Sequence, residues 1–220
     1  MKLLIINGSP KPGKNNTAVL LERFIDGFKE TEGNEVEIFR MNNEQAYKEA
    51  ALRFEAAAAV LIAFPLYSYA MPAGIKTFIE ELEPLLGKCH GKKVGFLVQY
   101  GFVEAAHARP LEMYLEHVSK MLCCDYLGTI IKGGCDNLAK SENGNRKIRM
   151  GAYEIGKTFG ATGYFDKEQI DAYAAPEVQK KRNGFLLKFI LKIVNKVYWE
   201  KSFKKNGVTY ESSFAKPYGD

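Results

Sequence analysis

The chain has few cysteines, and their spacing matches no common metal or redox motif. The four cysteines of the 220 residues, Cys89, Cys123, Cys124 and Cys135, include no C-x-x-C pair. Without that spacing, a redox dithiol, an iron–sulfur cluster and a zinc ribbon are all disfavoured. The three histidines form no metal-binding pattern either. We therefore expect buried, reduced thiols and no metal site.

Long apolar runs are missing as well. No uninterrupted apolar stretch reaches the ~20 residues that cross a bilayer, and the apolar start at residues 3–6 is too short for a signal peptide. Hydrophobic residues make up 46% of the chain and charged residues 26%, as in ordinary soluble globular domains. At this length we expect one α/β domain, located in the cytoplasm.

Two nucleotide-binding fingerprints are absent near the N-terminus. The dinucleotide pattern G-x-G-x-x-G does not occur there. Gly8 and Gly13 have the glycine spacing of the Walker motif, and Lys14 follows, but Asn15 stands where the magnesium-binding hydroxyl belongs. The expected second strand ends at Arg40 without an acid placed to hold a ribose. A mononucleotide fits this region better than NAD or ATP.

Acidic residues are scarce at the C-terminus. Residues 180–220 contain ten Lys and Arg against three acids, whereas residues 1–179 contain 21 against 23. The net charge of +5 therefore comes from a basic tail on a nearly neutral body. The body has no basic patch large enough to suggest nucleic-acid binding, so no nucleic-acid partner is expected.

The most informative stretch that is present lies at residues 2–24. An apolar strand-like run ends at Asn7, small and polar residues follow, and a helical pattern begins at Thr17. Free backbone N–H groups at a helix start, together with the helix dipole, favour a bound phosphate. Ser9, Asn16 and Thr17 would add side-chain donors, and Thr17 is expected to be the N-cap. The alternative is an ordinary turn whose polar residues only cap the helix and contact water.

Strand and helix patterns alternate along the chain, which indicates a parallel sheet with crossover helices. Near-continuous apolar runs such as residues 60–64 are typical of strands buried on both faces. The expected fold is α/β, a doubly wound five-stranded parallel sheet of flavodoxin type. The expected strands are 2–7, 35–40, 59–64, 93–99 and 126–131, and the expected helices are 17–30, 44–57, 74–86, 110–122 and 145–160.

Ligands of such sheets lie outside the carboxyl ends of the strands, so the loops after the third and fourth strands matter. The third strand leads into residues 64–74, FPLYSYAMPAG, where Pro65 and Pro72 restrict the backbone. We expect Tyr67 or Tyr69 to cover a flat ring. The alternative is that these aromatic side chains pack on a neighbouring helix or subunit.

The loop after the fourth strand offers a second wall for such a ring. Gly101 gives the backbone room to approach a ligand, and Phe102 supplies an apolar surface. His107 could donate a proton or bind a nicotinamide phosphate. Because no second catalytic group is spaced to work with it, we expect His107 to have no chemical role.

Several of these motifs together resemble one family. Residues 6–10 read INGSP, 16–17 read NT, 65–67 read PLY and 71–80 read MPAGIKTFIE. In this order they resemble the flavodoxin-fold NAD(P)H-dependent FMN reductases, whose pattern is a G-S-P loop ending in Asn-Thr, then P-x-Y and M-P-x-x-x-K after the third strand. The resemblance covers roughly residues 1–160. The FMN-binding residues that it implies are Ser9, Lys11, Asn16 and Thr17 for the phosphate, Pro65, Leu66 and Tyr67 for the ribityl chain and ring, and Gly101 and Phe102 for the far side.

The resemblance implies an enzyme that uses FMN and NAD(P)H. Hydride would pass from NAD(P)H to N5 of FMN and on to a small-molecule electron acceptor, which would be a quinone, azo, nitro or flavin compound. The resemblance also implies a homodimer. The alternative from another class is a non-enzymatic flavodoxin-like electron carrier or FMN-binding module, although such carriers are usually strongly acidic. A scaffold that has lost its flavin is the third possibility.

The basic tail contains an unusual amphipathic pattern. Residues 185–199 are apolar on most sides of a helix, and Lys188, Lys192 and Lys196 form one narrow stripe. We expect a basic amphipathic C-terminal helix that packs within the protein or across a dimer. Binding to a membrane surface through residues 185–199 is the less favoured alternative. The expected domains are a flavodoxin-like FMN-binding domain, 1–165, and a C-terminal helical extension, 166–220.

Overall fold

The computed structural model describes residues 1–41, 43–140, 145–179, 193–194, 199–209 and 211–215. The chain divides into two compact units, Met1–Gln179 and Lys180–Asp220. The first unit contains the sheet and the candidate site. In the second unit, the described helices are α8 (Glu200–Lys205) and the short η4 (Glu211–Phe214). Most of the amphipathic segment 185–199 lies outside the described residues, so its expected helix stays a prediction.

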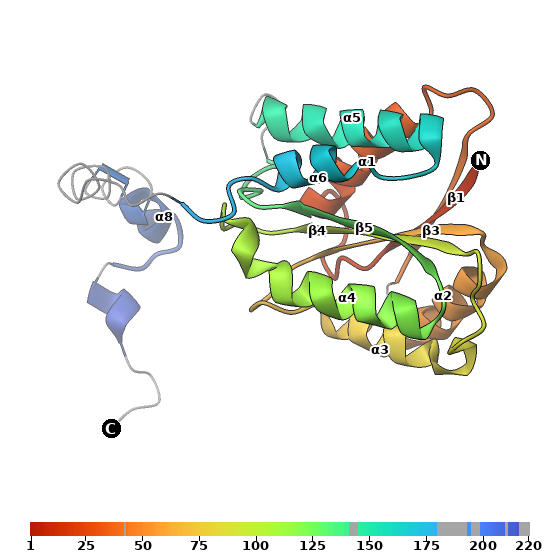
Figure 1. The fold of residues 1–220 in the computed structure, drawn as a ribbon. Helices are drawn as coiled ribbons and strands as arrows, with labels where there is room; N and C mark the ends of the chain where they lie inside the picture. Colours follow the sequence, from red (N-terminus) through yellow and green to blue (C-terminus); the bar gives the residue numbers. More distant parts are fainter. Residues whose placement is uncertain (42, 141–144, 180–192, 195–198, 210, 216–220) are drawn as a thin grey trace. The chain divides into compact units, whose positions relative to one another are not determined.

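The first unit is built on one five-stranded parallel sheet with the order β2-β1-β3-β4-β5, as Figure 1 shows. This order confirms the doubly wound flavodoxin-type fold that the sequence predicts. The expected strands agree with the structure to within one residue. The strands are β1 (Lys2–Asn7), β2 (Glu35–Arg40), β3 (Ala59–Pro65), β4 (Lys93–Gln99) and β5 (Asp125–Lys132).

Helices cover both faces of this sheet (Figure 1). On one face lie α1 (Asn16–Phe28), α5 (Arg146–Thr162) and α6 (Lys167–Ala174). On the other face lie α2 (Glu44–Ala56), α3 (Ala73–Glu81) and α4 (Arg109–Met121). The expected helix 74–86 is broken, because α3 ends at Glu81 and a short 3₁₀ helix, Glu83–Leu85, follows.

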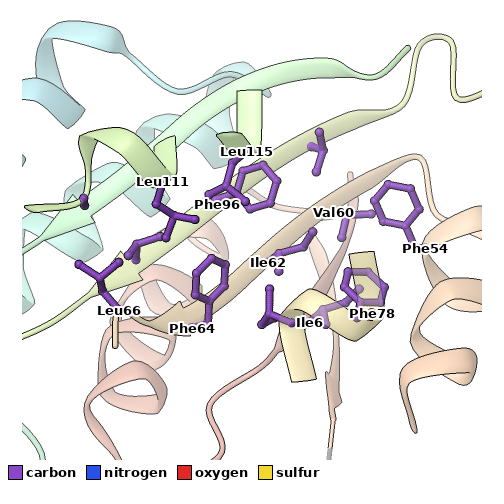
Figure 2. Close-up of a cluster of buried hydrophobic side chains, with 14 of the residues drawn as sticks. Ile6, Phe54, Val60, Ile62, Phe64, Leu66, Phe78, Phe96, Leu111 and Leu115 are labelled. Carbon is purple, nitrogen blue, oxygen red and sulfur yellow. The ribbon is translucent and has the colours of Figure 1, made fainter. Parts of the chain in front are cut away.

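The core has two halves, one on each side of the sheet. Successive strand residues point to opposite faces, so Leu4 and Ile6 pack with α2, α3 and α4, while Leu3 and Ile5 pack with α1 and α5. Figure 2 shows the first half, where Ile6 and Phe64 lie among side chains from both strands and helices. Burial on both faces explains why the strands read as continuous apolar runs.

The first unit extends beyond the boundary that the sequence suggests at residue 165. Helix α6 packs on the sheet, with Ile170 and Ala174 buried in the core. The backbone then reaches the 3₁₀ helix Ala105–His107 that precedes α4, where the N–H of Ala105 donates to the carbonyl of Pro176 (3.0 Å). Arg109 also forms an ion pair with Glu177, Nη2 to Oε2 2.8 Å. The extension therefore begins after Gln179.

Two further expectations concern the cysteines and membrane-spanning helices. All four cysteines are free; Cys89 and Cys135 are buried, and Cys123 and Cys124 are half-buried. Burial raises the pKa of the Cys135 thiol to about 12, so this thiol stays protonated at neutral pH. Within the described part of the chain, no helix has the length and apolar character needed to cross a bilayer.

Candidate functional site

The loop at residues 8–15, here called the phosphate loop, is organised by Asn15. The Asn15 side chain is buried, and its Nδ2 donates to the carbonyls of Lys11 (2.8 Å) and Gly13 (3.1 Å). Its Oδ1 accepts from the N–H of Ala18 (3.0 Å), so Asn15 is the N-cap of α1. The expectation that Thr17 is the N-cap is wrong, because the cap lies two residues earlier, at Asn15, and the helix begins at Asn16. Asn15 holds both the loop and the helix start.

The start of α1 suits a phosphate group. The N–H groups of Asn16 and Thr17 precede the first intrahelical bond, which runs from Val19 N–H to Asn15 C=O. The first turn contains no acidic residue, so no side chain repels an anion there. Lys11 is exposed on the loop and can add a positive charge. This helix start has the free donors and the charge that a terminal phosphate requires.

The predicted side-chain donors of the phosphate site also serve the fold. The Asn16 Oδ1 accepts from the N–H of Ala139 (2.9 Å), which ties α1 to the loop after β5. Thr17 is fully buried, and its Oγ1 accepts from Gln99 Nε2 (3.1 Å), leaving its own O–H to donate elsewhere. Ser9 is half-buried at the start of the loop, and its N–H donates to Asn7 Oδ1.

The loop after β3, here called the aromatic loop (residues 66–72), contains a tight two-residue turn. Tyr67 and Ala70 exchange both backbone hydrogen bonds at 2.9 Å. Between them, Ser68 and Tyr69 have φ of 48° and 64°, the sign that type I′ turns require and that Asn-Gly adopts most easily. Pro65 and Leu66 are buried beneath the turn, while Tyr67 is 51% exposed and Tyr69 61%. The turn holds two aromatic rings outside the sheet edge.

Residues other than glycine or asparagine in this turn carry strain, which leads to a prediction about stability. Replacing both central residues, Ser68→Asn with Tyr69→Gly, should raise the free energy of unfolding by about 1 kcal/mol. Urea denaturation would measure the change, with Tyr69→Phe as the control that keeps the strained backbone and should leave stability unchanged. A double variant less stable than the native chain would contradict the assignment of strain to these two residues.

The loop after β4 is joined to the loop after β5. The N–H of Cys135 donates to Tyr100 C=O (2.9 Å) and the N–H of Gly134 to Phe102 C=O (2.8 Å). A methyl group on Gly101 would lie only 2.5 Å from Asp136 Oδ1, so Asp136 takes the space that the glycine leaves. Phe102 is 69% exposed at the rim. The loop at 133–140 is thus part of this edge.

His107 lies among the aromatic residues of this edge. Its ring centroid is 5.0 Å from that of Phe102 and 5.3 Å from that of Tyr69, which come from different loops. Its Nε2 lies 3.2 Å from Glu104 Oε2, which orients the imidazole. Burial raises the pKa of nearby Tyr100 to about 12, and its hydroxyl donates to Glu104 C=O. Sequence spacing missed this grouping because Tyr69 and His107 are 38 residues apart.

The predicted site residues therefore gather at one edge of the sheet. They lie at the carboxyl ends of β1, β3 and β4, which are neighbours in the sheet. The sequence did not predict three features of this edge. Asn15 holds the phosphate loop and caps α1, Asp136 lies beside Gly101, and His107 lies next to the rings of Tyr69 and Phe102. The glycine pair Gly133-Gly134 after β5 could have indicated that this loop belongs to the site. Ligands lie outside the carboxyl ends of the strands, and this holds for β5 as it does for β1, β3 and β4.

The first unit also has a cavity at the other edge of the sheet. A cavity of about 530 Å³ lies at the amino ends of the strands, next to Met1 and Lys93. Its charged lining residues are Lys2, Glu37, Arg53 and Lys93, and it includes none of the loops that follow β1, β3 and β4. Across the described ranges, no group of three or more His, Cys, Asp or Glu side chains could hold a metal ion.

Comparison with known proteins supports the architecture. A family model described as having the flavodoxin-like fold matches residues 1–150. Among solved structures, an NADPH-quinone reductase from P. pentosaceus is 16% identical, with a TM-score of 0.58, and the match covers 74% of this chain and 99% of that one. An azoreductase from Bacillus anthracis str. Sterne is 17% identical, with a TM-score of 0.55 and coverage of 72% and 98%. A comparison with curated proteins found no match.

Proposed function

The chain belongs to the family with the flavodoxin-like fold, and on this premise we propose that it is an FMN-dependent NAD(P)H oxidoreductase. The acceptor would be a quinone, azo, nitro or flavin compound. One observation carries the proposal. The first turn of α1 contains no acidic residue, and exposed aromatic side chains, Tyr67 and Phe102, follow the ends of the nearby strands β3 and β4. The printed names of two structural neighbours, a quinone reductase and an azoreductase, agree with this class of acceptor.

The chain's own residues would divide the work of binding between the loops. The N–H groups of Asn16 and Thr17, with Lys11, would hold the FMN phosphate at the positive end of α1. Tyr67 and Phe102 would flank the ring system from two sides. When bound, FMN supplies the hydride-accepting ring and the protein supplies binding, orientation and electrostatics. This division explains why the sequence contains no acid–base pair.

His107 would act at the acceptor. Tyr69 and Phe102 are both exposed and both lie next to its ring, which suits a flat aromatic molecule. Reduction of a quinone or azo group also takes up protons. With its Nε2–H bonded to Glu104, the imidazolium form of His107 would donate a second hydrogen bond from Nδ1. We propose that His107 positions the acceptor, in contrast to the preferred expectation from the sequence that it has no chemical role.

The experiment that tests the proposed function separates the cofactor from the reaction. Purified protein should be yellow, and the flavin released by heat should run with FMN and not with FAD on chromatography. The protein should then oxidise NADPH or NADH when a simple quinone or an azo dye is added. FAD in the released fraction, or no flavin after reconstitution with FMN, would contradict the cofactor assignment. Bound FMN without turnover would favour the electron carrier.

The proposal includes a cytoplasmic homodimer as the working form. The resemblance to the FMN reductases suggests the pairing, and the wide apolar surface of residues 185–199 suggests which segment would be buried by it. The mass of the intact protein by light scattering tests this directly, and a monomer at working concentration would contradict it.

A further inference from the structure

A short segment at the end of the first unit holds the loop that carries His107. This segment, residues 176–179, follows α6 and is here called the 176–179 segment. Its partners lie in residues 104–109, although 68 residues separate Arg109 from Glu177 and 75 separate Glu104 from Gln179. The proposed binding of FMN does not use these contacts, so they need an explanation of their own.

His107 ends a 3₁₀ helix that is too short to fix its own position. This helix, Ala105–His107, has three residues, and the hydrogen bond that its His107 N–H donates within the turn is long at 3.4 Å. The N–H groups of its first two residues lie at a helix start, where no intrahelical partner exists. They donate instead to the carbonyls of Pro176 (3.0 Å) and Glu177 (3.1 Å). Contacts with the 176–179 segment therefore help to decide where His107 lies.

The carboxylate of Glu104 connects the 176–179 segment directly to the imidazole. Its Oε1 accepts from the backbone N–H of Gln179 at 3.0 Å, and its Oε2 lies 3.2 Å from His107 Nε2. The Glu104 backbone carbonyl also accepts from the Tyr100 hydroxyl at 2.8 Å. An ionised carboxylate only accepts hydrogen bonds, so it places the proton of a neutral imidazole on Nε2. Nδ1 is then the ring nitrogen that remains for a ligand.

An ion pair attaches the same segment on the other side of His107. Arg109 is the first residue of α4, and its Nε and Nη2 donate to Glu177 Oε1 (3.1 Å) and Oε2 (2.8 Å). Two parallel hydrogen bonds between a guanidinium and a carboxylate fix a geometry better than a single contact does. The same guanidinium is also held from α4, because its Nη1 donates to Glu112 Oε2 at 2.7 Å. The 176–179 segment is therefore attached both before and after His107.

The exact position of the imidazole matters because exposed aromatic rings lie next to it. The ring centroids of Tyr69 and Phe102 are 5.3 Å and 5.0 Å from that of His107. These rings limit where a flat acceptor can lie, so a small shift of the imidazole misaligns the hydrogen bond that it offers. We propose that the 176–179 segment is part of the acceptor site, in which Glu104 and Glu177 are positioning residues that fix the orientation of His107. This inference rests on the proposed function for the identity of the acceptor.

Nitrogen NMR of the histidine rings in the full chain tests the positioning without any turnover. In Glu104→Gln, the amide oxygen can still accept from Gln179 N–H, but the amide nitrogen is a donor and cannot accept from Nε2–H of His107. The proton of the neutral imidazole should therefore lie on Nε2 in the native chain and mainly on Nδ1 in this variant. Glu177→Gln should shift the same signals, because it weakens the paired contact with Arg109. The loss of signals in His107→Gln identifies them, and an unchanged His107 spectrum in either glutamate variant would overturn the inference.

Steady-state kinetics of the flavin-loaded full chain supply the second test. Glu177→Gln should raise KM for a simple quinone about threefold or more, and it should change kcat and KM for NADPH or NADH less than about twofold, because only the acceptor meets His107. Glu116→Gln is the matched control on α4, since it also removes a glutamate charge from an ion pair, with Lys120 in place of Arg109. It should leave all of these constants within about twofold. An equal rise in the quinone KM in Glu116→Gln would reveal a general effect of charge and overturn the inference.

The two tests separate this inference from the proposed function. Protein that holds no FMN would contradict the proposed function, whereas the NMR spectra would still decide whether Glu104 and Glu177 position His107. Conversely, turnover with an unchanged quinone KM in Glu177→Gln would overturn the inference and leave the proposed function in place.

Discussion

The Asn15→Ala variant is expected to lose FMN affinity by about 2 kcal/mol, or roughly thirtyfold in Kd. The alanine removes the hydrogen bond that caps Ala18 N–H. It also removes both hydrogen bonds from the side-chain amide to the carbonyls of Lys11 and Gly13. The phosphate loop would then have to be ordered by the ligand. Riboflavin has no phosphate, so its affinity should hardly change. Fluorescence titration of the apoprotein with both flavins measures the difference.

Two variants serve as controls for this prediction. Asn15→Ser keeps an acceptor for Ala18 N–H and loses only the two amide donors, so its FMN affinity should fall between those of the native chain and Asn15→Ala. Asn43→Ala removes an equivalent cap, from Ala46 N–H at the start of α2, and leaves the hydrogen bonds of Asn15 to the phosphate loop in place. It should lower stability without changing FMN binding. Equal losses for FMN and riboflavin in Asn15→Ala would mean that Asn15 supports the fold alone.

A chain ending at residue 165 should lose about 4 kcal/mol or more of unfolding free energy relative to one ending at Gln179. The shorter chain lacks α6, whose Ile170 is 7% exposed and whose Ala174 is 2% exposed. The shorter chain also loses two hydrogen bonds of Tyr173. The Tyr173 hydroxyl donates to Ile148 C=O, and Lys132 Nζ donates to Tyr173 C=O. Against a typical stability of ~5–15 kcal/mol, this loss is severe.

Urea denaturation of both truncated chains tests this boundary, with the full chain as reference. The chain ending at Gln179 should stay folded, with a midpoint well above that of the chain ending at 165, because the first compact unit ends there. An equal midpoint for the chain ending at 165 would show that α6 is dispensable.

Light scattering of the chain ending at Gln179 also tests the role of the C-terminal tail. We expect a monomer or aggregates, and an unchanged soluble dimer would contradict a packing role for residues 185–199.

The sequence predicts the framework well because its signals are local. Each buried strand is a short apolar run, and each helix has an apolar stripe, so both are visible within a few residues. The error at the N-cap has a local cause too: Asn15 and Thr17 are both good caps, and only the backbone shows where the helix begins. Helix α6 escaped prediction because it has only eight residues, and its burial depends on the sheet beneath it.

The sequence by itself determined the α/β fold of flavodoxin type. It also determined that the loops after β1, β3 and β4 lie at one edge of the sheet, because parallel strands bring their carboxyl ends to the same edge. Only the tertiary structure decided which side chains meet there. Thr17 contacts Gln99, 82 residues away, and Asn16 contacts Ala139, 123 residues away. A cavity between α1 and α5 is likewise lined by Arg23 and Arg146, 123 residues apart in the sequence. Contacts between distant segments depend on how helices pack in three dimensions, and no local pattern of residues encodes that packing.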